Sequence, residues 1–262
     1  MKKIGIVGCG NLGLSLLKGI RENNPEAILY GSKRNIESIQ KYEDQFTIIT
    51  SDNKKLIENC DIIILALKPF TVVPFLVEFN ASFVAEKHTI VSVATGVTIS
   101  EINACFSSEM DVFRAMPNTG SSVNESITMV SISSDELNRK KDVISIFDAV
   151  GDTIVIEETL MESATVLGAC GIAFVLRFMR AMIQGGIEIG FDAKTATKIV
   201  SQTVKGAAEL IIRNGSHPEE EIDKVTTPKG CTIVGLNEME HSGFSSSLIK
   251  GIVTSYQKIE KK

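Results

Sequence analysis

The sequence predicts an α/β fold in which a doubly wound, mainly parallel sheet is followed by an all-helical domain. Short β-branched runs alternate with segments of helical periodicity over the first 157 residues, which is typical of crossover connections between parallel strands. After Glu158 such strands vanish and long apolar helical segments follow. We therefore expect one domain over residues 1–157 and a second over residues 158–262.

The first domain begins with a strand, a tight turn and a helix. Lys3–Val7 is a short β-branched run that ends in glycines, and Asn11–Ile20 carries apolar residues at helical spacing. Further strands are expected at Ala27–Tyr30, Phe46–Thr50, Asp61–Leu67, Thr89–Ala94, Val112–Met116, Ser126–Ile132 and Thr153–Ile156. Helical segments separate most of these strands, so most neighbours in the sheet should be parallel.

The second domain is expected to contain one long, nearly all-apolar helix over Met161–Ile189, followed by helices at Ala193–Asn214 and Ile233–His241. One face of the long helix carries residues that would let another helix approach closely, namely Ala164, Gly168, Gly171 and Val175. Such a face suits pairing with a second subunit. The alternative is a helix buried inside its own subunit, because periodicity does not show which chain covers it.

Charge and cysteine content exclude several classes of protein. The 27 basic and 32 acidic residues give a net charge of -5 without a block of one sign, so nucleic acid is not expected as a partner. Five cysteines occur without a CxxC pair, which predicts neither a disulfide framework nor a metal site and fits the reducing cytoplasm.

The apolar stretch Val166–Leu176 is shorter than the roughly 20 residues that cross a bilayer, so no membrane span is expected.

A glycine-rich turn follows the first strand and has the spacing GxGxxG. Glycines at this spacing permit a tight turn and the close approach of a pyrophosphate, whose charge is stabilised by free N–H groups at the start of the next helix. The turn therefore predicts a dinucleotide-binding, Rossmann-type domain. The candidate cofactor residues are Gly8, Gly10, Asn11, Leu12 and Gly13. The alternative is a strand–helix turn without a ligand.

The end of the second strand indicates which dinucleotide is bound. An acidic residue there would accept hydrogen bonds from a ribose 2′-OH, but this chain has Ser32, Lys33 and Arg34, with Asn53 as a further candidate. Cations and a hydroxyl suit a 2′-phosphate. The expected cofactor is therefore NADPH, with NADH as the second choice. A solvated basic turn is the alternative.

Several later segments occur in an order that resembles one enzyme family. They are Asp61–Pro69, Ser92–Val97, Arg114–Thr119 and Val225–Thr232. In this order they resemble the Δ1-pyrroline-5-carboxylate reductases, which make L-proline with NAD(P)H. Ser32–Asn35, His217-Pro218 and Gly243-Phe244 also match the family pattern, and the resemblance covers nearly the whole chain.

The resemblance implies a Rossmann-type doubly wound sheet followed by an all-helical dimerisation domain. It implies intertwined subunits in a homodimer or higher oligomer, and an active site between the cofactor domain of one subunit and the helices of its partner. The further cofactor residues that match are Ala66, Lys68, Pro69, Thr95, Gly96, Met116 and Asn118. Of these, Thr95-Gly96 and Met116–Asn118 match the family's segments near the nicotinamide. The matching residues of the loop for the imino acid substrate are Val225, Thr227, Gly230, Cys231 and Thr232, with Thr227 and Thr232 as candidate catalytic residues.

Departures from the family pattern bear on the substrate. The family's Gly-Ser-Gly-Pro-Ala-Tyr at the start of the long helix is replaced by Ala169–Phe174, which lacks a hydroxyl and a proline. Its Pro-Gly-Gly becomes Pro228-Lys229-Gly230, and its glycine after the Met-Pro-Asn segment becomes Ser126. These changes leave the expected fold and cofactor as they were.

The substrate loop has features that suit a carboxylate. Thr227–Gly230 has proline and glycine at positions that suit a type I turn, and a helix is expected from about Cys231 or Thr232. Free N–H groups at that helix start and the two threonine hydroxyls would form an anion site, whereas the alternative is a helix cap without a ligand.

No catalytic acid is needed to protonate the ring nitrogen, because an imine can bind from water already protonated. His88, His217 and His241 occur in no catalytic or metal-ligating spacing and are expected at the surface or in loops. Cys9 and Cys231 are interpreted as small neutral residues because neither has a neighbouring base.

Three other functions stay open at this stage. A 3-hydroxyacid dehydrogenase shares the layout but carries a catalytic lysine on the long helix, whereas Gly168–Phe178 contains Arg177 and no lysine. A related imine reductase acting on another ring is the second alternative. The third is a non-catalytic nucleotide-binding regulator, because a fold by itself does not establish turnover.

Overall fold

The computed structural model describes residues 2–132 and 137–260, and the chain divides into two compact units. The first unit comprises Met1–Ile172 together with Tyr256–Lys262, and the second comprises Ala173–Ser255. The division expected from the sequence, between residues 157 and 158, stays a prediction.

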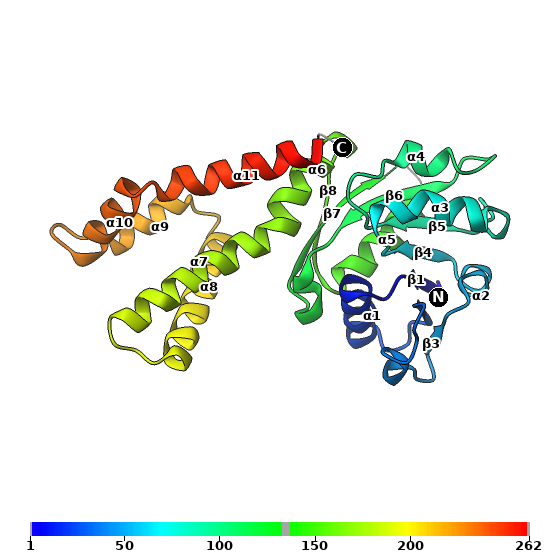
Figure 1. The fold of residues 1–262 in the computed structure, drawn as a ribbon, viewed down its shortest axis with the longest axis horizontal. Helices are drawn as coiled ribbons and strands as arrows, with labels where there is room; N and C mark the ends of the chain where they lie inside the picture. The colour runs from blue at the N-terminus through cyan, green and yellow to red at the C-terminus, as the bar shows by residue number, and fades with distance from the viewer. Residues whose placement is uncertain (1, 133–136, 261–262) are drawn as a thin grey trace. The chain divides into compact units, whose positions relative to one another are not determined.

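The first unit is built on an eight-stranded sheet with the order β3-β2-β1-β4-β5-β6-β7-β8 (Figure 1). The strands are β1 (Ile4–Val7), β2 (Leu29–Ser32), β3 (Thr47–Thr50), β4 (Ile62–Leu65), β5 (Thr89–Ser92), β6 (Asp111–Met116), β7 (Ser126–Ile132) and β8 (Gly151–Val155). All neighbours are parallel except β6 and β7. The predicted doubly wound, mainly parallel sheet is confirmed.

Helices cover both faces of this sheet because successive residues of each buried strand point to opposite sides. The helices are α1 (Asn11–Asn23), α2 (Asn53–Asn59), α3 (Pro69–Phe79), α4 (Ile99–Asn103) and α5 (Leu137–Asp148). Short 3-10 turns lie at η1 (Gln40–Tyr42), η2 (Asn80–Ser82) and η3 (Thr119–Val123).

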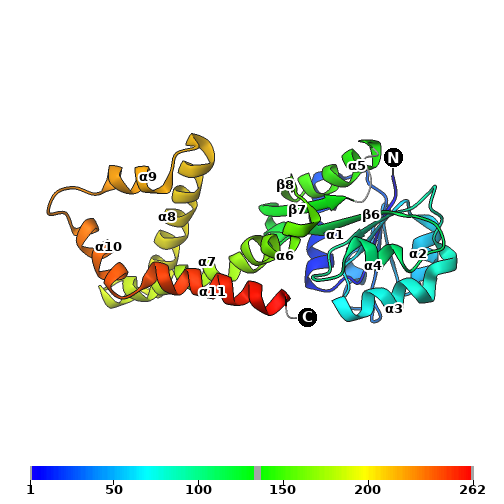
Figure 2. The same ribbon diagram turned by 90° about the horizontal axis from the view of Figure 1, so that it is seen from above.

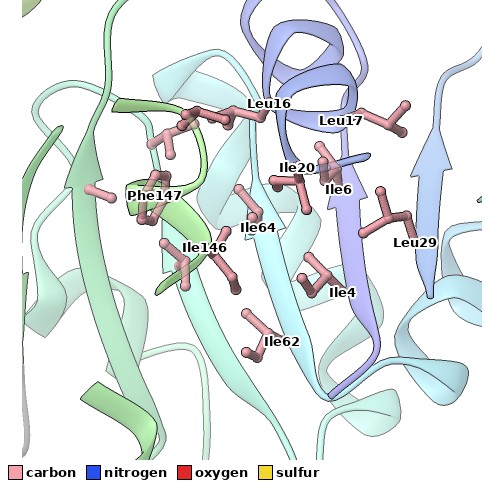
Figure 3. Packing of buried hydrophobic residues seen from close by; sticks show 14 of the residues in the cluster. Ile4, Ile6, Leu16, Leu17, Ile20, Leu29, Ile62, Ile64, Ile146 and Phe147 are labelled. Carbon is pink, nitrogen blue, oxygen red and sulfur yellow. The ribbon is translucent and has the colours of Figure 1, made fainter. Parts of the chain in front are cut away.

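The core consists of one large apolar cluster on each side of the sheet. Ile6 and Ile64 pack with α1 and α5 through residues such as Leu16 and Phe147 (Figure 3). On the other side, Val7 and the neighbouring strand residues pack with α2, α3 and α4. The first unit therefore buries its apolar helix faces against its own sheet.

The long helix predicted over Met161–Ile189 is continuous but not uniform. It consists of a 3-10 turn η4 (Glu158–Leu160), α6 (Met161–Ala164), a π-helical stretch η5 (Thr165–Cys170) and α7 (Gly171–Glu188). The π-helical stretch ends two residues before the last residue of this part of the first unit, Ile172, and overlaps the segment that departs from the family pattern. Wide turns of this kind are uncommon and often occur at functional sites.

The remaining helices are α8 (Ala193–Asn214), α9 (Pro218–Val225), α10 (Cys231–His241) and α11 (Phe244–Glu260), labelled in Figures 1 and 2. The expected bounds of α8 are confirmed, and α10 begins two residues earlier than the expected Ile233. The sequence prediction omitted α9 and α11. The sequence of α9 nevertheless contains features that favour a helix start, namely a proline at the first position and three acidic residues in the first turn.

The second unit leaves most of its apolar surface uncovered within the chain. Among the described residues α7, α9 and α10 bury none, and α8 buries only Ala196 and Val200. Leu176 of α7, for example, is 57% exposed. These helix faces need a cover that a single chain does not supply.

The helical stretch Glu158–Glu188 bears on the expectation that the chain has no membrane span. On length and composition alone this 31-residue stretch could cross a membrane. The expectation considered only the apolar stretch Val166–Leu176, which stops at Arg177, although the helix was itself predicted to run to Ile189 and runs to Glu188. Length and composition do not distinguish a membrane span from a helix that another protein surface covers.

Candidate functional site

The glycine turn lies where the order of the sheet changes direction. Gly8 follows β1 and Ala66 follows β4, and these two strands are neighbours although β2 and β3 come between them in sequence. Ligands of doubly wound folds bind at such a switch point, beyond the carboxyl ends of the strands. The structure therefore brings the first two predicted cofactor segments to one edge.

Two of the three glycines in the turn are required by packing. Gly8 has a φ of +92°, and a Cβ there would lie 2.6 Å from the Ala66 carbonyl oxygen. A Cβ on Gly13 would lie 2.5 Å from the Gly8 carbonyl oxygen. Around Gly10, by contrast, no described heavy atom lies within 4 Å of the Cβ position. The space beyond Gly10 is thus open, as a phosphate group requires.

The start of α1 is free to bind an anion. Gly10 caps the helix without a side chain, and its first turn contains no acidic residue. The first N–H groups of a helix have no partner inside it, so those of Asn11, Leu12 and Gly13 are available to a ligand. Below the turn, burial raises the pKa of the Cys9 thiol to about 12, and this residue is a neutral filler as expected.

The end of β2 places the predicted 2′-phosphate residues together. Ser32 is buried and its Oγ donates a hydrogen bond to Oδ1 of Asn53, the first residue of α2, over 2.7 Å. The expected strand ended at Tyr30, whereas β2 runs to Ser32 and so carries this hydroxyl at its end. Arg34 lies two residues further on, is exposed, and makes no side-chain hydrogen bond or ion pair with the described residues.

The other predicted cofactor segments lie along the same edge of the sheet. Lys68 is exposed and caps α3, whose first residue is Pro69. Thr95 and Gly96 follow β5, and Gly96 is exposed with a φ of +69°. The chain passes from there through α4 to β6, which ends at Met116.

The side chains of Met116 and Asn118 are used inside the first unit. Met116 is buried with Met129 and Met161. The Asn118 amide donates from Nδ2 to the Gly168 carbonyl oxygen over 3.1 Å and accepts at Oδ1 from the Gly120 N–H over 2.9 Å. This segment therefore offers a cofactor mainly its backbone.

Sequence reasoning overlooked the charged cluster behind this segment. Arg114 of β6 is 2% exposed and forms ion pairs with Glu158 and Glu162. The signal was an arginine in the middle of an apolar strand, because a guanidinium is rarely buried without charged partners.

The substrate loop of the second unit is a tight turn, but not of the expected type. The Gly230 N–H donates to the Thr227 carbonyl oxygen over 2.9 Å, which closes the turn. Lys229 has a φ of +60°, so the turn is type II and the predicted type I turn is wrong. Proline and glycine at the outer positions suit both types, and the sequence therefore did not distinguish them.

The start of α10 resembles that of α1 in being open to an anion. Gly230 caps it without a side chain, and its first turn has no acidic residue. Thr227 and Thr232 are exposed, and their hydroxyls make no hydrogen bond to the described residues. Val225 and Cys231 are exposed beside them. Neither threonine therefore serves as a cap within the described part of the chain.

The histidines were expected at the surface or in loops, and His88 lies in the loop before β5. His88 is buried, not at the surface; its Nδ1 accepts a hydrogen bond from the Val84 N–H over 2.8 Å, and burial lowers its pKa. His217 caps α9, and His241 is the last residue of α10. Across the described residues no cluster of three or more His, Cys, Asp or Glu side chains could hold a metal ion.

A doubly wound sheet with a glycine-rich turn at its switch point, joined to a helical unit whose apolar faces lack a cover, is typical of nucleotide-dependent oxidoreductases. Comparison with known proteins narrows this class. Residues 158–262 match the family model for pyrroline-5-carboxylate reductase dimerisation, and residues 3–96 match the model for NADP oxidoreductase, coenzyme F420-dependent. The chain belongs to the pyrroline-5-carboxylate reductase family.

Individual relatives support this assignment over the full length. Pyrroline-5-carboxylate reductase 2 of Dictyostelium discoideum is 41% identical over 99% of this chain and 93% of that protein. Pyrroline-5-carboxylate reductase 1 of the same organism is also 41% identical, but this chain spans only 49% of its length. A crystal structure of the Plasmodium falciparum pyrroline carboxylate reductase with NADP bound has a TM-score of 0.89 at 25% identity, covering 99% of this chain and 97% of that one.

The dimerisation match accounts for the uncovered apolar helices of the second unit. Residues 158–262 include α7 to α11, whose apolar faces find little cover in their own chain. We therefore assign the protein as a homo-oligomer.

Proposed function

We propose that this chain reduces the C=N bond of 1-pyrroline-5-carboxylate and forms L-proline, with NADPH as the hydride donor. Family membership supports the reaction. The observation that carries the proposal is the loop Thr227–Thr232, which presents free helix N–H groups and two unpartnered hydroxyls among the described residues. An uncapped helix start of this kind suits the carboxylate of the substrate.

NADPH fits the residues at the carboxyl edge of the sheet. Its pyrophosphate would lie over Gly8–Gly13, where the chain leaves open space beyond Gly10. Its 2′-phosphate would contact Ser32, Asn53 and Arg34. The remaining proposed contacts are Ala66, Lys68, Pro69, Thr95, Gly96, Met116 and Asn118. When bound, NADPH supplies the hydride.

The second unit would hold the imino acid. Its carboxylate would accept hydrogen bonds from the first N–H groups of α10 and from Thr227 and Thr232, with Val225, Gly230 and Cys231 around it. The ring nitrogen arrives protonated from water. Hydride then adds to the carbon of the C=N bond, the π electron pair moves to nitrogen, and a secondary amine results. This balance requires no protein acid, so orientation is the main task of the protein.

Several properties follow from the same proposal. The smallest assembly is a homodimer, with a higher oligomer as the alternative, because the apolar faces of α7 need a second copy. We place the protein in the cytoplasm, where its free cysteines would stay reduced. Membranes and nucleic acids are not part of the proposed function.

An absorbance assay tests this function directly. Purified protein is mixed with pyrroline-5-carboxylate and either NADPH or NADH, and the loss of reduced nicotinamide is followed. We expect turnover with a preference for NADPH. A 3-hydroxyacid with oxidised cofactor serves as the control substrate and should give none. Absence of turnover with the imine would overturn the proposal.

A further inference from the structure

Two carboxylates at the start of the long helix meet one buried arginine of the sheet. Nη1 of Arg114 lies 3.0 Å from Oε1 of Glu158, and Nη2 lies 2.8 Å from Oε1 of Glu162. All three residues belong to the first unit. A buried guanidinium requires such partners, so β6 and the segment Glu158–Glu162 are firmly joined.

The same side of β6, continued by the residues that follow it, makes two more contacts with the long helix. Arg114, Met116 and Asn118 are alternate residues and point the same way along the extended chain. Met116 clusters with Met161, and Asn118 donates to the Gly168 carbonyl oxygen. The strand whose end is assigned to the nicotinamide thus holds the helix at three successive places.

Glu158 makes a contact that Glu162 does not. Its Oε1 also accepts a hydrogen bond from the Ile99 N–H over 2.8 Å. Ile99 is the first residue of α4 and follows the Thr95–Gly96 loop. The Glu158 carboxylate therefore connects the loop after β5 with Arg114 of β6, and these are the two segments assigned to the nicotinamide.

We propose that Arg114 and Glu158 are positioning residues for hydride transfer. The pair fixes the spacing between the Thr95–Gly96 loop and the Met116–Asn118 segment, and so fixes the orientation of the nicotinamide ring. This inference rests on the proposed function, because it assumes that these segments flank the ring. Neither residue belongs to the glycine turn or to the 2′-phosphate residues, so the pair governs placement of the ring and not affinity for NADPH.

The test compares Glu158→Ala with Glu162→Ala. Each variant removes one carboxylate from the same guanidinium, but only Glu158→Ala releases the Ile99 N–H. Because a displacement near 1 Å can slow a reaction about a hundredfold, we expect kcat of Glu158→Ala to fall roughly tenfold to hundredfold. Its KM for NADPH should stay the same. Glu162→Ala should keep most of the wild-type kcat below its melting temperature.

Three comparisons distinguish a positioning role from a purely structural one. The primary isotope effect with NADPH deuterated at the transferred position should rise in Glu158→Ala and stay constant in Glu162→Ala. Glu158→Gln, whose amide oxygen can still accept both hydrogen bonds, should restore most of the rate. The emission of bound NADPH should change in Glu158→Ala alone, and the chain contains no tryptophan to complicate that measurement.

Each outcome decides one question. Equal losses of activity in both alanine variants, in proportion to melting temperature and with constant isotope effect and emission, would mean that the cluster is only structural. If the wild type binds NADPH but does not reduce the imine, the proposed function fails. The emission comparison would still decide whether Glu158 orients the ring.

Discussion

The two units of this chain both contain strongly apolar helices, but they differ in what covers them. In the first unit, Leu16 of α1 and Phe147 of α5 are completely buried against the sheet. In the second, α7 is more apolar in sequence than α1 or α5, yet none of its described residues is buried. An apolar face therefore shows that a helix will be covered, whereas only the structure shows whether its own chain provides the cover.

The change from a helix covered by its own chain to a helix without such a cover occurs within a single turn of the long helix. A Cβ on Gly168 would lie 2.4 Å from Cε of Met129, so this glycine is required inside the chain. At Gly171 the nearest heavy atom would be 4.0 Å away. The predicted small-residue face is thus divided: Gly168 serves the first unit, and Gly171 is available to a second copy.

Gly171→Leu should have the largest effect, because it acts on the surface that lacks a cover. A leucine would hold a second helix away, and we expect dissociated or insoluble protein. Sedimentation at several concentrations measures this. Gly168→Ala is the matched control: its Cβ would meet Met129, so it should lower the melting temperature at every concentration and leave the oligomer intact. If Gly171→Leu forms the same oligomer as the wild type, Gly171 does not lie at the contact with a second copy.

Arg34→Asp should affect the first unit alone. The new carboxylate would repel a 2′-phosphate, and the loss of a charged hydrogen bond costs about 1.5–3 kcal/mol. We therefore expect kcat/KM with NADPH to fall roughly tenfold to hundredfold. Activity with NADH should persist. Lys41→Asp makes the same charge change on another exposed residue of this unit and should leave the preference unaltered. Equal loss of both cofactors in Arg34→Asp would refute the assignment.

Thr232→Val should affect the second unit in the corresponding way. Valine keeps the shape but removes a hydroxyl, so kcat/KM for the imine should fall roughly tenfold to hundredfold while NADPH binding persists. The melting temperature should stay constant, because this hydroxyl has no hydrogen-bond partner among the described residues. Thr203→Val, on α8, is the control for kinetics and should leave kcat/KM for the imine unaltered, although it removes a hydrogen bond to the Ile199 carbonyl oxygen. Normal kinetics with lower stability would mean that Thr232 is structural.

Lys229→Gly should have the smallest effect. The left-handed φ of +60° is unfavourable for lysine and costs glycine little, so stability should rise by about 0.5–1 kcal/mol. Thermal unfolding measures the gain. Lys229→Ala removes the side chain but keeps the unfavourable backbone and should give no gain. If alanine stabilises as much as glycine, the effect comes from charge and not from backbone strain.

Local patterns in the sequence were sufficient to predict the sheet. All eight strands were expected because each is a compact β-branched or apolar run between turn signals. The same reasoning omitted α9 and α11, although the apolar residues of both recur at helical spacing. It also assigned the wrong turn at Thr227–Gly230, because the sign of φ at Lys229 depends on backbone geometry and not on the residues that flank it.

The candidate site was only partly accessible from sequence. Glycines and polar residues at strand ends predicted which segments meet at the carboxyl edge of the sheet. The Arg114 cluster was not predictable in this way, since its carboxylates lie 44 and 48 residues further along the chain. The burial of His88 likewise depends on packing around a loop. The roles of the individual site residues stay predictions.

The long helix also has a consequence for how the protein is made in the cell. A ribosome releases Glu158–Glu188 before the chain is complete, and this stretch is apolar enough to pass for a membrane anchor. Until a second copy covers it, chaperones and other nascent chains can bind to this exposed apolar surface. We therefore expect the yield of folded protein to depend on the expression level and on how fast new copies associate, as well as on the stability of each unit.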